Sequence, residues 1–275
     1  MPTKALNLTA KHLITTAFMA ALAASVAGCG STSKFTTGSI SRSDSRPLET
    51  MSSGELRTAT SRLGQSYARN PDDKRVAMNF AAALQMDGDA DQSLAVMRKL
   101  AIAYPKDREV LAAYGKALAA NGQFEPALDA VRRAQTPEYP DWKLVSAEAA
   151  ILDQMGQKDE ARQDYRKALE LKPNEPSVLS NLGMSYVLEG DLRTAETYMR
   201  SAAQQPGADS RVRQNLALVV GLQGRFDEAE KIASQELSPE QARANVAYLR
   251  QMLAQQNAWS QLKDQDKDKA KVATN

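Results

Sequence analysis

Histidine and cysteine are almost missing from this sequence. Among its 275 residues the only histidine is His12 and the only cysteine is Cys29. The chain beyond residue 29 therefore has no imidazole and no thiol, and it cannot form a Cys/His zinc site, a Ser-His-Asp triad or a Cys-His dyad. We predict no metal, no cofactor and no catalytic residues, although the composition still permits chemistry that uses carboxylates alone.

The sequence also lacks a surplus of charge of one sign. The formal net charge of +2 comes from Lys4 and Lys11, and without residues 1–28 the chain has 33 bases and 33 acids. A neutral chain lacks the sequence-independent attraction to phosphate on which nucleic-acid binding depends, so we predict no nucleic-acid partner. A hydrophobic content of 43% with only 5% aromatics suits a soluble, alanine-rich helical protein.

One uncharged stretch stands near the beginning of the chain. Leu13–Val26 has 14 residues, fewer than the roughly 20 that a spanning helix needs but enough for the core of a secretion signal. It follows a start that contains Lys4, Lys11 and no acid. We therefore predict a signal peptide over residues 1–28.

The signal peptide ends in Val26-Ala27-Gly28-Cys29, which resembles the bacterial lipobox. The resemblance implies a lipid on Cys29 and cleavage after Gly28, and Gly30 in place of Asp implies sorting to the outer membrane, facing the periplasm. The alternative is that Cys29 is a buried residue at the end of an ordinary hydrophobic helix. Residues 29–53 are rich in Ser and Thr, so we predict a lipidated cysteine followed by a flexible tether.

Small residues recur with a period of 34. The repeated glycines are Gly88, Gly122, Gly156, Gly190 and Gly224, preceded seven residues earlier by Ala81, Gly115, Ala149, Gly183 and Ala217, and followed five residues later by Ser93, Ala127, Ala161, Ala195 and Ala229. A glycine can adopt the left-handed conformation that ends a helix, and small residues let two helices pack closely. The period predicts five helix–turn–helix units.

This pattern resembles the tetratricopeptide (TPR) repeat. In its best copy the residues that match the family motif are Leu179, Leu182, Gly183, Tyr186, Gly190, Ala195 and Ala202. The resemblance implies an all-α solenoid over residues 54–259, with repeats at about 74–107, 108–141, 142–175, 176–209 and 210–243, a helix before them at 54–70 and a capping helix after them from 239. Tyr139 replaces a closing proline, so we expect an unusual angle between repeats two and three. We predict a disordered charged tail over 260–275.

The TPR family binds proteins on the concave surface that the first helix of each unit lines. The residues that the resemblance places there are Arg75, Met78, Asn79, Lys143, Ser146, Ser180, Asn181, Met184, Arg211, Gln214, Asn215 and Leu218. Asn79, Asn181 and Asn215 share one register, and a carboxamide can pair with the amide groups of an extended peptide. Asn181 and Asn215 would form a two-rung ladder. Alternatively, these asparagines only satisfy local polar groups.

A lipobox, a short tether and a TPR array together resemble the TadD family of lipoproteins, which assemble the tight-adherence (Flp) pilus. The resemblance implies a non-catalytic, pilotin-like scaffold that helps a secretin or other pilus components to assemble. The alternative is a periplasmic TPR adaptor for peptidoglycan-remodelling or other envelope-assembly proteins. A carboxylate-dependent hydrolase is disfavoured, because no pair of acids stands out from the helical surface pattern.

Overall fold

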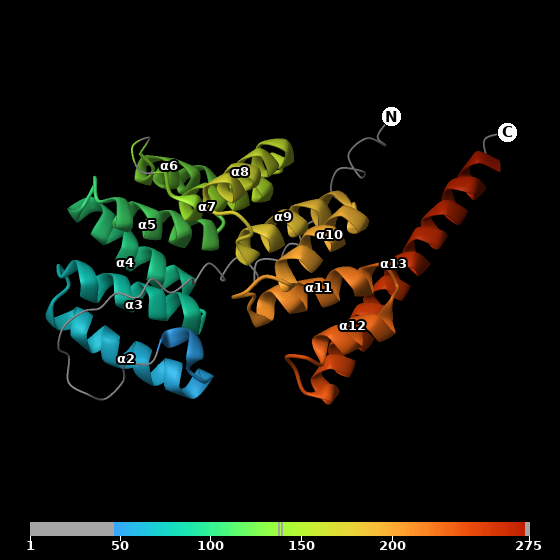
Figure 1. Cartoon of the computed structure of the whole chain (residues 1–275), viewed down its shortest axis with the longest axis horizontal. Helices are drawn as coiled ribbons and strands as arrows, with labels where there is room; N and C mark the ends of the chain where they lie inside the picture. The colour runs from blue at the N-terminus through green and yellow to red at the C-terminus, as the bar shows by residue number, and fades with distance from the viewer. Residues whose placement is uncertain (1–46, 137, 139, 273–275) are drawn as a thin grey trace. The chain divides into compact units, whose positions relative to one another are not determined.

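The computed structural model describes residues 47–136, 138 and 140–272 (Figure 1). The predicted signal peptide, Cys29 and most of the predicted tether lie outside these residues. Within them every regular element is a helix, which confirms the predicted all-α fold.

The helices follow one another in pairs after two short N-terminal elements. Their bounds are η1 Leu48–Thr50 (a 3-10 turn), α2 Ser53–Arg69, α3 Lys74–Asp87, α4 Ala90–Ala103, α5 Arg108–Ala120, α6 Phe124–Ala134, α7 Trp142–Gln154, α8 Lys158–Leu171, α9 Pro176–Glu189, α10 Leu192–Ala203, α11 Ser210–Leu222, α12 Phe226–Ala233 and α13 Pro239–Val272. The pairs from α3/α4 to α11/α12 coincide with the five predicted repeats.

The chain divides into two compact units between Leu171 and Lys172. Unit 1 contains α2 to α8 and thus repeats one to three; unit 2 contains repeats four and five together with α13. The glycine period passes through this boundary unchanged, so the sequence indicated one continuous array. The expected irregularity between repeats two and three depends on Tyr139, which lies outside the described residues.

Within each unit the first helices of successive repeats are neighbours. The two helices of each repeat pack against each other, and α3 contacts α5, α5 contacts α7, and α9 contacts α11. The second helix of a repeat also packs against the first helix of the next one in its unit, as α4 does on α5 and α10 on α11. The first helices therefore line one surface of each unit.

Aspartates begin the first helices at the same 34-residue spacing. The side chains of Asp73, Asp107, Asp141 and Asp209 accept hydrogen bonds from backbone N–H groups in the first turns of α3, α5, α7 and α11. Such caps satisfy N–H groups that a helix leaves unpaired. The fourth repeat differs: Glu175 makes no side-chain cap, and Pro176 fills the first helical position, where no N–H donor is needed.

The repeated glycines end helices and allow close packing, as predicted. Gly88 and Gly190 follow α3 and α9 with φ of 91° and 89°, a left-handed conformation that strains other residues. A Cβ on Gly183 would lie 2.9 Å from Met199 Cγ and 3.1 Å from the carbonyl oxygen of Ala195. The spacing between α9 and α10 thus depends on the missing side chain.

The N-terminal helix agrees with the prediction more closely than the tether does. α2 covers Ser53–Arg69, and Ser52 and Glu55 form a capping box at its start. The predicted tether, however, does not stay free of structure up to residue 53, because η1 forms at Leu48–Thr50 and contacts α3. The half-buried Leu48 gives this turn an apolar anchor that the surrounding Ser and Thr residues lack.

The last helix begins at the predicted residue and extends beyond the predicted end of the solenoid. α13 begins at Pro239, packs against α11 and α12, and buries Ala242, Val246 and Leu249, as a capping helix should. α13 continues to Val272, through most of the segment 260–275 over which the sequence predicts a disordered charged tail. No glycine or proline occurs between Pro239 and the end of the chain, so the sequence contains no signal to stop the helix.

Candidate protein-binding surfaces

The two Asn rungs of unit 2 lie on α9 and α11, which contact each other. Asn215 on α11 donates a hydrogen bond from Nδ2 to Oγ of Ser180 on α9, at 3.1 Å. Ser180 is 3% exposed, so its hydroxyl serves the contact between the repeats and is not available to a ligand. The alternative interpretation, in which asparagines satisfy local polar groups, therefore holds for one amide donor of Asn215.

The other groups of this pair remain open. Within the described residues no hydrogen bond uses Oδ1 of Asn215 or the side chain of Asn181, and both residues are only half-buried. Met184 and Leu218 are half-buried on the same two helices, and Met184 packs against a core cluster that includes Met199 and Val220. We define the inner face of unit 2 as Asn181, Met184, Asn215 and Leu218.

Two further predicted residues of α11 are occupied locally. The guanidinium of Arg211 donates to Oδ2 of Asp209 from Nε at 3.0 Å and from Nη2 at 2.8 Å. Gln214 donates to Oγ of Ser210 at 2.8 Å. Both residues are exposed, so these bonds compete with water and a ligand could displace them.

The predicted residues of unit 1 lie on α3 and α7. These two helices do not belong to successive repeats, and α5 contacts both of them. Arg75 and Asn79 are exposed on α3, and Met78 is half-buried. On α7, Ser146 is buried at 3% exposure, whereas Nζ of Lys143 lies 5.6 Å from the centre of the Trp142 ring. Ser146 is therefore part of the core, and Arg75, Asn79 and Lys143 remain accessible.

The helices behind the inner face of unit 2 are joined by an ion network that the sequence analysis missed. Oε1 of Glu196 on α10 accepts hydrogen bonds from Arg200 at 2.7 Å and from Arg225 at 2.6 Å, and its Oε2 accepts one from Gln223 at 2.8 Å. Burial raises the pKa of Glu196, but the hydrogen bonds from Arg225, Gln223 and Arg200 outweigh it and lower the pKa to about 2. The carboxylate therefore stays charged and ties repeat five to repeat four.

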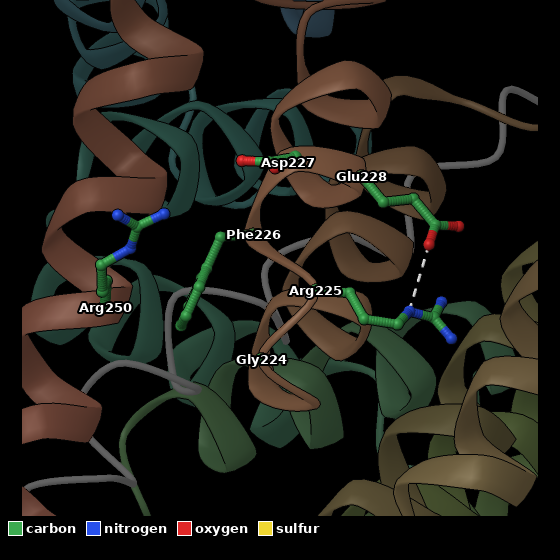
Figure 2. Close-up of a pocket in the computed structure, with 6 residues that line it drawn as sticks. All are labelled: Gly224, Arg225, Phe226, Asp227, Glu228 and Arg250. Atoms are coloured by element: carbon green, nitrogen blue, oxygen red, sulfur yellow. Dashed lines mark ion pairs between the residues drawn. The ribbon is translucent and has the colours of Figure 1, made fainter.

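An open pocket of about 340 Å³ lies where α12 begins beside α13, and none of its lining residues was predicted (Figure 2). The guanidinium of Arg250 sits 4.6 Å from the centre of the Phe226 ring, while Arg225 points the other way to an ion pair with Glu228 at 3.1 Å. Arg250 thus already occupies the face of the ring that could attract a cation. We interpret the pocket as a contact that holds α13 on α12.

Two acids of unit 1, Glu148 on α7 and Asp164 on α8, have the interaction within the described residues that most resembles a catalytic pair. Burial raises the pKa of Asp164, and the charge of Glu148 raises it further. Such shifts also occur in catalytic acids. Here Glu148 accepts hydrogen bonds from Arg132 at 2.6 Å and from Gln135 at 2.7 Å, an arrangement that joins α6 to α7.

The part of the chain that the structure describes holds no group of three or more His, Cys, Asp and Glu side chains placed to bind a metal ion. In the same residues no helix is both long enough and apolar enough to cross a membrane.

Comparison with known sequence families gives one consistent result. A family model described as tetratricopeptide repeat matches residues 50–117, and another described as TPR repeat matches residues 151–190. No curated protein sequence matches the chain.

Solved structures share the fold at low sequence identity. A tetratricopeptide repeat protein from Parabacteroides merdae has a TM-score of 0.62 and 14% identity, over 71% of this chain and 78% of that one. A thermophilic TPR protein from Thermus thermophilus has a TM-score of 0.55 and 21% identity, over 64% and 97%. PilW, a type IV pilus biogenesis factor, has a TM-score of 0.55 and 17% identity, over 72% and 94%. These similarities establish the fold alone.

Proposed function

Since this chain is a tetratricopeptide repeat protein, we propose that it is a non-catalytic scaffold that holds other proteins, and that its task is to assemble a tight-adherence (Flp) pilus. TPR proteins are in general protein-interaction scaffolds. The observation that supports a binding role here is the inner face of unit 2, where Asn181 and Oδ1 of Asn215 are unused by the described residues beside Met184 and Leu218. Amide groups beside apolar side chains suit an extended peptide.

The proposed location of the protein is the cell envelope. The sequence Val26-Ala27-Gly28-Cys29 supports a lipid on Cys29, and several acyl chains on one residue would give stable anchoring, since each buried methylene contributes about 0.8 kcal/mol. The anchor would hold the protein at the outer membrane, facing the periplasm. Its partners there would be a secretin or other pilus components. The pilus role of PilW, which has the same fold, makes a pilus the first system to test.

The test is crosslinking in living cells with a tag after Asn275, purification from the membrane fraction and mass spectrometry. We expect a secretin or Flp-pilus proteins to be enriched, and the enrichment to fall in the Asn181→Ala/Asn215→Ala double variant. The matched control is Gln204→Ala/Asn245→Ala, which removes two exposed amide side chains from elsewhere in unit 2. Thermal unfolding by circular dichroism checks that both variants fold.

Three outcomes decide between the proposals. Enrichment that survives Asn181→Ala/Asn215→Ala would keep the pilus role and exclude this inner face. Recovery of peptidoglycan-remodelling enzymes without pilus proteins would favour the envelope adaptor instead. A Cys29→Ser variant that stays in the membrane fraction would contradict the lipid anchor.

A further inference from the structure

Unit 1 presents a second inner surface, made by α3, α5 and α7. These three helices are neighbours, since α3 contacts α5 and α5 contacts α7. Each carries a basic residue that reaches solvent: Arg75 and Lys116 are exposed, and Lys143 is half-buried. We call these three residues the basic strip. Ala82 and Ala120 are also exposed, seven residues after Arg75 and four after Lys116, and these spacings place them on the same face of α3 and α5 as the charges.

The basic strip has no acidic partner within the described residues. The acid in the same register on α5, Glu109, is already paired, because its Oε2 lies 2.9 Å from Nζ of Lys74. Lys74 also contacts Asp107 at 2.7 Å. No ion pair of the described residues involves Arg75, Lys116 or Lys143.

The helix-capping aspartates could neutralise two of these charges, but they do not. In unit 2 the capping Asp209 pairs with Arg211, two residues later. Arg75 and Lys143 stand at the same distance after Asp73 and Asp141, yet neither forms that pair, and Nζ of Lys143 lies near the ring of Trp142 instead. The side-chain oxygens of Asp73 and Asp141 accept backbone N–H bonds of α3 and α7.

The second helices of the repeats in unit 1, which we call its outer helices, carry charges of both signs. On α6, Arg133 pairs with Asp129 at 3.3 Å, and α8 exposes Asp159 and Glu160 together with Arg166. Charges of both signs are thus mixed there, whereas on the face of α3, α5 and α7 that carries the basic strip the one acid, Glu109, is paired with Lys74. Surface charges of one sign attract a partner of the opposite sign and increase its rate of association.

From these observations we infer that the inner surface of unit 1 binds an acidic segment of a partner protein. The inference rests on the scaffold function proposed above and gives unit 1 a ligand chemistry different from that of unit 2. Unit 2 offers amide and apolar groups, and its equivalent cation, Arg211, is neutralised by Asp209. Acidic side chains would pair with Arg75, Lys116 and Lys143, while the segment passes over the alanines.

The probe is a fluorescent peptide of glutamate and alanine, compared with a peptide of equal length in which glutamine replaces glutamate. Anisotropy is measured with the purified full chain in detergent. We expect only the glutamate peptide to bind, more weakly as salt is added, because exposed ion pairs are screened. The variant Arg75→Glu/Lys116→Glu/Lys143→Glu should bind the glutamate peptide at least about tenfold more weakly. Each reversed contact lowers the affinity by a smaller factor, and the three factors multiply.

The matched control is Arg98→Glu/Lys106→Glu/Arg166→Glu, which reverses three exposed cations outside the basic strip, on α4, in the turn before α5 and on α8. None of the three forms an ion pair within the described residues. Its net charge equals that of the first variant, and its affinity should stay within about twofold of the parent. Equal losses in the two variants, or equal binding of the glutamine peptide, would overturn the inference.

A positional readout does not depend on net charge. A photoreactive amino acid at Ala82 or Ala120 should crosslink the glutamate peptide, and one at the exposed Ala95 on α4 should not. Crosslinking at Ala95 alone would also overturn the inference. If the peptide fails to bind while the in-vivo partner is still lost in Asn181→Ala/Asn215→Ala, the scaffold function stands and only the acidic ligand of unit 1 is rejected.

Discussion

Single side chains, or their absence, set the distance between paired helices. Gly183 has no room for a Cβ, which would lie 2.9 Å from Met199 Cγ and 3.1 Å from a backbone oxygen that cannot turn away. Gly115 has the same problem, since a Cβ there would lie 2.7 Å from Val131 Cγ2. Larger residues at these positions have to push two helices apart.

We therefore expect Gly183→Ala to lower the free energy of unfolding by about 1–3 kcal/mol, the usual cost of overpacking a core. Urea unfolding of the full chain followed by circular dichroism measures it. Gly54→Ala is the matched control, because no atom lies within 4 Å of a Cβ at that position in α2, and it should leave stability unchanged or raise it by up to about 1 kcal/mol. Equal stability of Gly183→Ala and the parent would show that α9 and α10 can separate at little cost.

Residue types indicated the contacts of the candidate binding residues only in part. The asparagine register was visible in the sequence, and Asn215 does lie on α11 next to α9. The bond from Asn215 to Ser180 was not predictable, because it joins residues 35 apart in the chain and depends on how two repeats pack. Burial of Ser146 and Ser180 likewise follows from neighbouring helices and not from the period.

Helices are positioned by contacts between repeats as well as by their own sequences. The clearest case is Glu196 on α10, which receives hydrogen bonds from Arg225 and Gln223 at the turn before α12. Glu196 is 13% exposed on its side chain, so solvent screens these bonds only partly. Arg225 neutralises the charge that burial would otherwise make costly, and Gln223 stabilises that charge by a hydrogen bond.

Stability should therefore depend on pH at this residue. The folded pKa of Glu196 is about 2 and its ordinary value is 4.5. Because the folded pKa is lowered, the stabilisation is complete above pH 4.5 and is lost as pH falls towards 2, by up to about 3 kcal/mol. Urea unfolding at several pH values should show a shallower acid loss for Glu196→Gln than for the parent. Identical pH profiles would mean that the ion network adds nothing to folding.

Helix boundaries were predictable wherever a local signal marks them. Glycines marked the ends of α3 and α9, and Pro239 marked the start of α13. The capping aspartates have the same 34-residue period, but aspartate is also common on helical surfaces, so the residue type alone does not identify a cap. The charge of residues 260–275 is typical of a disordered segment, whereas the absence of glycine and proline there favours a helix such as α13, which continues to Val272.

The described chain divides into two compact units, between α8 and α9. The sequence could not indicate this, because the spacing from Gly156 to Gly190 equals every other spacing. A period reports which residues each repeat contains. How strongly neighbouring repeats associate depends on interface energies that the period does not encode.

Damage to one unit should accordingly remain in that unit. In hydrogen–deuterium exchange of the full chain, Gly183→Ala should speed exchange in α9 to α12 and leave α3 to α7 unchanged, because local opening follows cooperative groups of helices. Gly115→Ala should give the reverse pattern. Faster exchange throughout the chain in either variant would show that the two units unfold together.

The capping aspartates have a consequence for how such a chain can change its length. Deleting residues 108–141 would place Asp107 directly before Trp142, so α7 would still begin behind an aspartate. One repeat can therefore be deleted or duplicated between two capping aspartates, and the helix that follows the junction still has an aspartate cap. A lineage of such proteins could adjust the span of its binding surface in steps of one repeat, with an aspartate cap kept at the start of the helix pairs on either side of the junction.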